Sequence, residues 1–367
     1  MKSLTSFEVE PCFCTTQDGW DVPLYHITPE NRNSPYGPII LAHGLGTNRF
    51  NLAPPIMELS FAEFLRARGH DVWVIELRGA GRSRYRGGSM FTRTPNYDFG
   101  DYVKYDLPAL LDGIAQRTLA TKFHWIGHSM GGWLGYAAAM LYGSERFASL
   151  TAIASPAVTA NQHFALRQAY ALRPILKALR FFPAGLAGQA GKFAPSVGAQ
   201  AMNFLLANGA LIDPAFLKRL APIALSSVST KLIDQIAGWF DHNRKNPLEL
   251  GWRWEELSKV TTPVMALAGS VDQLAPEHNV RELLGRVSSE VKHLLLCGKN
   301  TGFSADFGHI DIMLSTPARL EIYPRIAHWV ESHLEEGESP AIAGRRVVQL
   351  HPANRRTHHQ SMIDHSA

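Results

Sequence analysis

The stretch from Phe123 to Tyr142 constrains the fold more than any other part of the sequence. An apolar run at 123–126 leads into the Gly-x-Ser-x-Gly motif at 127–131, and an alanine-rich helical pattern follows. This order predicts a strand, a sharp turn and a helix, with Ser129 held in a strained conformation at the turn. Glycines suit the turn because side chains there would collide with the neighbouring strand and helix. The first N–H groups of the helix are then free to stabilise negative charge beside Ser129.

The motif by itself is weak evidence for a nucleophilic serine. At ordinary glycine and serine usage, Gly-x-Ser-x-Gly arises by chance in roughly one of ten chains this long. A plain glycine-rich turn between two elements is the alternative interpretation. The choice between a nucleophilic serine and a plain turn therefore depends on the surrounding pattern and on the partners that a serine nucleophile needs.

The surrounding pattern alternates short apolar runs with amphipathic helical stretches. From the third strand onward this predicts an α/β fold with a mostly parallel, eight-stranded sheet and helices on both faces. The two N-terminal strands are expected to pair antiparallel at one edge. The expected strands are 7–15, 24–28, 38–43, 71–77, 122–128, 150–154, 264–269 and 291–297; the expected helices are 56–68, 101–118, 130–142, 277–284 and 317–334.

The alternation stops between residues 156 and 250. This segment contains helical patterns at 161–180, 199–208, 213–220 and 230–242, and it is rich in phenylalanine. We expect residues 156–250 to form a helical cap, inserted between two parts of the core domain, 1–155 and 251–335. The cap either selects an apolar substrate or only packs on itself. Residues 336–367 have little apolar periodicity, so a disordered tail is favoured over a histidine-rich metal site.

A serine hydroxyl needs a base, usually a histidine that a carboxylate orients. In the architecture predicted here, the acid and the base follow later strands in the order serine, acid, histidine. Asp272 follows the strand at 264–269, and His309 lies in a Gly- and Asp-containing loop after the last strand. Asp272 could instead be a turn or helix-capping residue, and Glu76 is the alternative acid.

Two backbone N–H groups are expected to bind the oxyanion that forms when a serine attacks a carbonyl. Met130, directly after the serine, would supply one, and Leu45 in the loop after the third strand would supply the other. His43 and Gly44 in the same loop, together with His128, are expected to shape the substrate-binding pocket. A simple glycine turn is the alternative for that loop.

Composition excludes several classes of protein. The formal net charge is only +4, with 36 basic and 32 acidic residues that form no long basic stripe, so nucleic-acid binding is not expected. Three cysteines give neither a disulfide framework nor a zinc site. No apolar run reaches the length of a membrane span, and no signal-peptide pattern follows Met1. We therefore expect a cytoplasmic protein without a metal or organic cofactor; brief contact with a membrane surface and the oligomeric state are left open.

The sequence resembles the α/β-hydrolases and, within them, the acid lipase family of gastric and lysosomal lipases. The resemblance covers about residues 7–155 and 255–334 and does not extend clearly into the cap. It is carried by the stretches at 15–20, 41–45, 71–74, 78–79, 104–109, 272–275 and 309–311. This resemblance implies hydrolysis of carboxylic esters of lipids by Ser129, Asp272 and His309 without a cofactor.

Together these features predict a serine hydrolase that acts on an apolar acyl ester through an acyl-enzyme. Two alternatives stay open at this level. The same residues could transfer the acyl group to an acceptor other than water, as an acyltransferase or a perhydrolase does. The chain could also be a ligand-binding homologue without catalytic activity.

Overall fold

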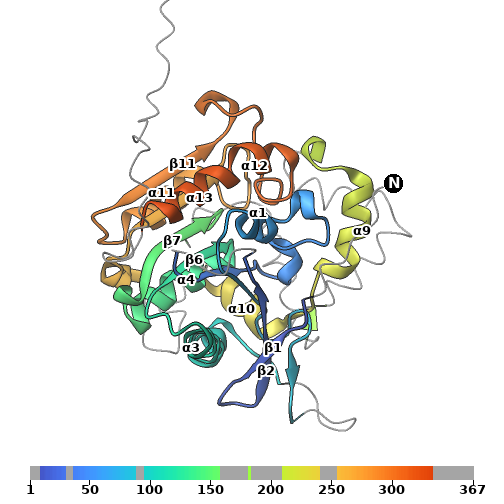
Figure 1. Cartoon of the computed structure of the whole chain (residues 1–367), viewed down its shortest axis with the longest axis vertical. Helices are drawn as coiled ribbons and strands as arrows, with labels where there is room; N and C mark the ends of the chain where they lie inside the picture. The colour runs from blue at the N-terminus through green and yellow to red at the C-terminus, as the bar shows by residue number, and fades with distance from the viewer. Residues whose placement is uncertain are drawn as a thin grey trace, which may run out of the picture.

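A central twisted sheet organises the molecule (Figure 1). The structure, a computed structural model, describes residues 9–29, 36–87, 95–157, 181–182, 209–239 and 254–333. Eight strands of the sheet lie in series in the order β1-β2-β4-β3-β6-β7-β10-β11, and the two-residue β5 pairs beside β2 as a ninth. The strands are β1 (Cys12–Thr15), β2 (Trp20–Ile27), β3 (Ile39–Ala42), β4 (Val72–Ile75), β5 (Arg84–Tyr85), β6 (Phe123–His128), β7 (Phe147–Ile153), β10 (Val264–Gly269) and β11 (Lys292–Cys297).

The pairing confirms the predicted sheet. The pairs β4–β3, β3–β6, β6–β7, β7–β10 and β10–β11 are parallel, whereas β1 and β4 both pair antiparallel with β2. Every residue of β3, β4, β6 and β10 is buried. Strands that are buried along their whole length need cover on both faces of a sheet, and the helices provide it.

The helices of the core follow the strands in alternation. In Figure 1, α13 and α12 lie beside α1 although they come from opposite ends of the described chain, and Tyr323 packs on Phe61 with ring centroids 4.6 Å apart. The helix α4 packs instead against β6 and β7. The core helices are α1 (Phe61–Ala67), α2 (Phe99–Asp101), α3 (Leu107–Thr118), α4 (Met130–Tyr142), α11 (Glu277–Gly285), α12 (Thr316–Glu321) and α13 (Tyr323–Glu331).

Three expected helices are interrupted. The stretch expected as one helix from 56 to 68 divides into a 3₁₀ turn, η2 (Met57–Leu59), and α1, because Ser60 between them is extended and caps α1. The stretch expected as one helix from 101 to 118 contains a π-helical turn at Tyr102–Asp106 (η3) before α3 begins. That turn presents Asp106 to Arg78, whose Nε donates to Asp106 at 2.8 Å in a buried pair. The stretch expected from 317 to 334 divides into α12 and α13, because Pro324 lacks the N–H that would continue the first helix.

The expected cap, 156–250, is described only in part. Residues 209–239 contain α9 (Pro214–Ala224), α10 (Thr230–Trp239) and a two-residue strand β9 (Val228–Ser229), which pairs with β8 (Phe181–Phe182). The helices α9 and α10 match two of the four expected there, whereas β8 and β9 were not predicted. The expected helices at 161–180 and 199–208, and the tail at 336–367, lie outside the described residues.

Candidate active site

Ser129 occupies the sharp turn between β6 and α4. Its backbone has φ 54° and ψ −117°, a conformation that residues with side chains rarely adopt. The two glycines of the motif make this turn sterically possible. A Cβ on Gly127 would lie 2.1 Å from Gly131, and a Cβ on Gly131 would lie 2.2 Å from the carbonyl oxygen of Ala42 in β3. Strain of this kind persists where the surrounding structure over-determines it, which is common at functional sites.

The start of α4 and the loop after β3, which contain the two expected oxyanion donors, both lie close to this turn. Met130 is the first residue of α4, and the first N–H groups of a helix have no acceptor within it. The loop after β3 approaches from the other side, because a Cβ on Gly44 would lie 3.3 Å from Cβ of Ser129. Leu45 follows Gly44 and is 38% exposed, so this loop is accessible from outside.

Asp272 and His309 meet although 37 residues separate them in the sequence. Nδ1 of His309 donates to Oδ2 of Asp272 at 2.9 Å, and the carboxylate side chain is fully buried. Oδ1 of Asp272 accepts the N–H groups of Leu274 at 2.8 Å and Ala275 at 2.9 Å. Burial alone would raise the pKa of Asp272, but the His309 imidazole and the two N–H groups outweigh it and lower the pKa below its usual value. The carboxylate is therefore charged and oriented at neutral pH.

Backbone contacts hold the loops of these residues together. The N–H of Val271 donates to the carbonyl of Phe307 at 3.1 Å, which ties the loop after β10 to the loop after β11. Nε2 of His128, the residue before Ser129, lies 2.8 Å from the carbonyl oxygen of His309, and the two imidazole rings are 4.9 Å apart. The loop of His309 is thus fixed against the turn of Ser129. Within the described residues, no hydrogen bond joins the Ser129 hydroxyl to His309.

His43 and His128, expected to shape the pocket, are both buried. The ring nitrogens of His43 face the carbonyl of Gly44 at 2.8 Å and the N–H of Leu77 at 3.2 Å. Burial lowers the pKa of both histidines, that of His128 to about 3, so both are neutral at pH 7. Because protein groups face all four ring nitrogens, these side chains support the loops around the turn from inside.

Glu76, the alternative acid, has other partners. Its buried carboxylate accepts hydrogen bonds from the Tyr25 hydroxyl at 2.9 Å and the Arg82 N–H at 2.9 Å, and it forms an ion pair with Arg49 at 3.1 Å. These contacts give Glu76 a role in joining β2, β4 and the loop after β3. His309, whose loop contacts the Ser129 turn, pairs with Asp272 and not with Glu76.

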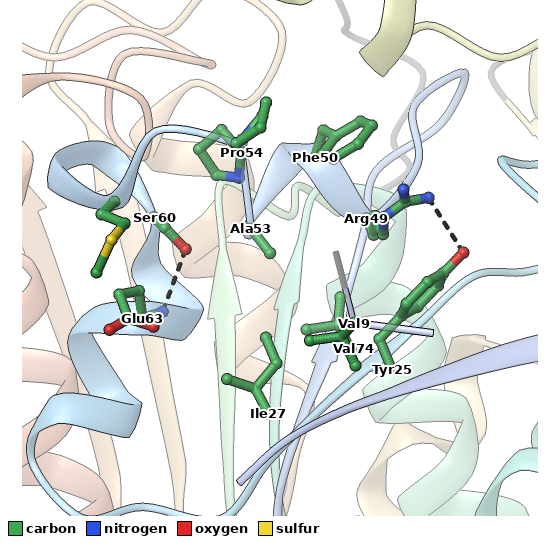
Figure 2. A pocket seen from close by; sticks show the side chains of 12 residues that line it. Val9, Tyr25, Ile27, Arg49, Phe50, Ala53, Pro54, Ser60, Glu63 and Val74 are labelled. Carbon is green, nitrogen blue, oxygen red and sulfur yellow. Dashed lines mark hydrogen bonds between the residues drawn. The ribbon is translucent and has the colours of Figure 1, made fainter. Parts of the chain in front are cut away.

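Two hollows in the molecule lie away from Ser129. A cavity of about 40 Å³ opens beside the short 3₁₀ helix η1 (Arg49–Asn51). Figure 2 shows its lining, which combines apolar and aromatic side chains with the polar side chains of Arg49, Ser60 and Glu63. That volume has room for a few water molecules, too little for an acyl chain. A larger groove of about 810 Å³ is lined by residues such as Pro38 and Asp71, which precede β3 and β4. It lies at the amino ends of the strands, the edge of the sheet opposite to Ser129.

The described part of the insertion packs at the Ser129 edge of the sheet. Trp239 of α10 contacts Trp133 of α4 with ring centroids 5.6 Å apart. The N–H of Ser226, just after α9, donates to the carbonyl of Gly46 at 2.9 Å. Asn48 donates to the carbonyl of Ile223 in α9 at 2.7 Å. The insertion is therefore bonded directly to the loop that contains Gly44 and Leu45.

Asn51 also belongs to this region, although no sequence pattern predicts it. Its side chain contacts the backbone of Gly44 and the ring of His128. No local motif marks the residue, since the contact with His128 spans 77 positions.

Comparison with known proteins identifies the family. The α/β-hydrolase fold family matches residues 37–313, most of the chain, and the chain belongs to this family. Gastric triacylglycerol lipase of Mus musculus is 26% identical over 356 residues, which cover 85% of each chain. Human lysosomal acid lipase/cholesteryl ester hydrolase is 30% identical over 142 residues, 37% of this chain and 36% of that one.

Solved structures agree on the fold. An esterase from Exiguobacterium antarcticum superposes with a TM-score of 0.61 at 16% identity over 88% of this chain and 100% of that one. A monoacylglycerol lipase from Paleococcus ferrophilus gives 0.54 at 20% identity over 84% and 99%. The predicted fold class and the resemblance to acid lipases are thus confirmed, and the chain is a hydrolase of the lipase and esterase type.

Among the described residues, no helix has the length and apolar character needed to cross a bilayer. The same part of the chain contains no group of three or more His, Cys, Asp or Glu side chains suited to hold a metal ion. All three cysteines are free thiols.

Proposed function

We propose that the chain hydrolyses carboxylic esters with an apolar acyl group by means of Ser129, His309 and Asp272. The observation that carries this proposal is the buried 2.9 Å hydrogen bond between His309 and Asp272, on loops bonded to the strained turn of Ser129. The order of the three residues and their positions after β6, β10 and β11 are those of the nucleophile-elbow architecture. The acid lipase relatives, named for triacylglycerol and cholesteryl ester substrates, support an acyl ester of a lipid.

In this mechanism the Ser129 hydroxyl transfers its proton to Nε2 of His309 while Oγ forms a bond to the ester carbonyl carbon. The N–H groups of Leu45 and Met130 stabilise the oxyanion. His309 then protonates the leaving alcohol oxygen as the ester bond breaks and an acyl-serine forms. A water molecule gives a proton to His309 and attacks the acyl carbon, which releases the acid and returns the proton to Ser129. Asp272 keeps the imidazole in the required tautomer and stabilises its protonated form.

The described helices of the insertion support a cap over this site. The proposed boundaries are 156–250 for the cap, 1–155 and 251–335 for the two parts of the core, and 336–367 for a tail. The bonds from α9 to the loop of Leu45 and the packing of Trp239 on Trp133 favour a cap at the carboxyl edge of the sheet. A cytoplasmic location is supported by the three free thiols, because disulfides are rare in reducing compartments.

An ester panel from acetyl to palmitoyl, assayed with wild type and variants, tests the proposal. Ser129→Ala and His309→Gln should each lose at least about 10⁴-fold in kcat, since the members of such a triad act as a unit. Ser288→Ala, a change at an exposed serine between α11 and β11, should match wild type. Turnover in Ser129→Ala equal to wild type would reject the nucleophile, and a preference for acetyl esters would reject the apolar acyl group.

The same panel separates hydrolysis from acyl transfer. Adding an alcohol or hydrogen peroxide and measuring the acyl products identifies the acceptor. Free acid as the dominant product is the expected result. A dominant transfer product would replace hydrolysis by transferase or perhydrolase activity and leave the triad unchanged.

A further inference from the structure

Asn51 lies under the loop after β3 and holds that loop through its side chain. The residue is 4% exposed and ends the 3₁₀ helix η1. Its Oδ1 accepts the backbone N–H of Gly44 at 3.0 Å, a fully buried contact. Gly44 directly precedes Leu45. By binding the Gly44 N–H, Asn51 therefore fixes the peptide group next to the one that contains the Leu45 N–H, the proposed oxyanion donor.

Further polar contacts lead from Asn51 through His128 to the loop of His309, the proposed base. Nδ1 of His128 lies 3.0 Å from Oδ1 of Asn51, and Nε2 of His128 lies 2.8 Å from the carbonyl oxygen of His309. One continuous path of buried polar contacts therefore joins the loops after β3, β6 and β11. These are the three loops that carry Leu45, Ser129 and His309.

His128 cannot donate a hydrogen bond to both of its neighbours on this path, Asn51 and His309. A neutral imidazole has a single N–H, yet both nitrogens of His128 face oxygen atoms. His128 can therefore donate to the His309 carbonyl or to Asn51, but not to both at once. The Gly44 N–H is always a donor, so Oδ1 of Asn51 holds the oxyanion loop whichever nitrogen of His128 carries the proton.

We propose that Asn51 is a positioning residue of the oxyanion hole, which aims the Leu45 N–H by anchoring Gly44 and links this loop through His128 to the loop of the base. The inference rests on the proposed function. A donor for the oxyanion acts in the transition state and hardly at all on the bound ester, so its displacement lowers kcat and leaves KM nearly unchanged. Removing one oxyanion donor costs about 10²- to 10³-fold in kcat, and a misaimed donor should cost about 10- to 100-fold.

The test compares variants that differ in one acceptor atom. Asn51→Leu keeps the side-chain size and removes the acceptor for Gly44; it should lose about 10- to 100-fold in kcat with KM within about threefold of wild type. Asn51→Asp keeps an acceptor oxygen and should recover most of that loss. If Asn51→Leu does not fold, Asn51→Ala compared with Asn51→Asp gives the same contrast.

Ser149→Ala is the control. Ser149 is a buried residue of β7, and its hydroxyl contacts Nδ1 of His124 at 2.8 Å near the amino ends of β6 and β7, away from Ser129. This variant loses a buried polar contact, so it should lower the melting temperature while kcat stays within about threefold of wild type. An equal kcat loss in Ser149→Ala and Asn51→Leu would reduce the role of Asn51 to packing and overturn the inference.

A transition-state mimic gives the second readout. A trifluoromethyl ketone forms a tetrahedral adduct with a serine nucleophile and places an oxyanion in the hole, so its affinity should fall in Asn51→Leu by about the factor lost in kcat. Unchanged inhibition and unchanged kcat in an active, folded Asn51→Leu would overturn the inference and leave the proposed function intact. Absence of turnover in the wild type would instead reject the proposed function itself.

Discussion

Replacing Asp311 by asparagine should stabilise the protein above pH 7 and change little near pH 4. Asp311 lies in the loop after β11 with none of its surface exposed. The N–H of Gly308 donates to its Oδ2 at 2.8 Å, while Oδ1 has no hydrogen-bond partner among the described residues. Burial raises the pKa of this carboxyl to about 7, because a carboxylate loses its hydration there.

The sign and the size follow from the two pKa values. In the unfolded chain the carboxyl titrates near its usual value of about 3.9. Between about pH 4 and pH 7 the unfolded chain loses this proton while the folded chain keeps it, so stability falls as the pH rises. A difference of about three pH units, at about 1.4 kcal/mol for each unit, gives a cost of about 4 kcal/mol at pH 8. Asparagine has the same shape, can still accept the Gly308 N–H, and has no proton to lose.

Urea unfolding followed by tryptophan fluorescence at pH 4, 6 and 8 measures the effect. The gain in unfolding free energy of Asp311→Asn over wild type should grow from near zero at pH 4 to about 3 to 4 kcal/mol at pH 8. Asp306→Asn in the same loop is the control of opposite sign. The Asp306 carboxylate accepts the Lys299 N–H and the Ser270 hydroxyl, which lower its pKa, so this variant should lose stability at pH 8 and recover as the pH falls below 4. A gain for Asp311→Asn that is the same at every pH would refute the reasoning.

Two further predictions concern stability. Leu119 is 86% exposed in a left-handed conformation with φ 58°, so Leu119→Gly should raise the urea midpoint by the equivalent of about 1 kcal/mol; a lowered midpoint would contradict this. The Arg78 guanidinium is 2% exposed and bonds Asp106 at 2.8 Å and Asp18 at 2.6 Å. Arg78→Met leaves the Asp106 carboxylate buried and unpaired, and thermal unfolding should register a loss of about 3 to 5 kcal/mol; a loss below about 1 kcal/mol would contradict it.

The order of elements was readable from the sequence because each part has a local pattern. Apolar runs bounded by glycine, proline or aspartate marked the eight strands of the main series. Gly-x-Ser-x-Gly between a strand and a helix placed Ser129 at its turn. Asp272 and His309 could be selected because parallel strands end at one edge of the sheet, so loops distant in the sequence meet there.

The remaining features depend on contacts that no local pattern encodes. The π-helical turn before α3 coincides with the pairing of Asp106 with Arg78, and its sequence is compatible with an ordinary helix. β5 is two residues long and arises from pairing with β2, so it has no periodicity to detect. Asn51 is identified only by its contacts with Gly44 and His128, which exist once the sheet has brought the three loops together.

Mass spectrometry after treatment with a fluorophosphonate tests the central claim most directly, since this reagent bonds covalently to an activated serine. Trypsin should release residues 123–146 as one peptide, and its fragment ions distinguish Ser129 from Ser144. We expect one adduct, on Ser129, that forms at least about 10³-fold more slowly in His309→Gln and is absent in Ser129→Ala. An adduct on another residue, or labelling of Ser129→Ala at the wild-type rate, would contradict the claim.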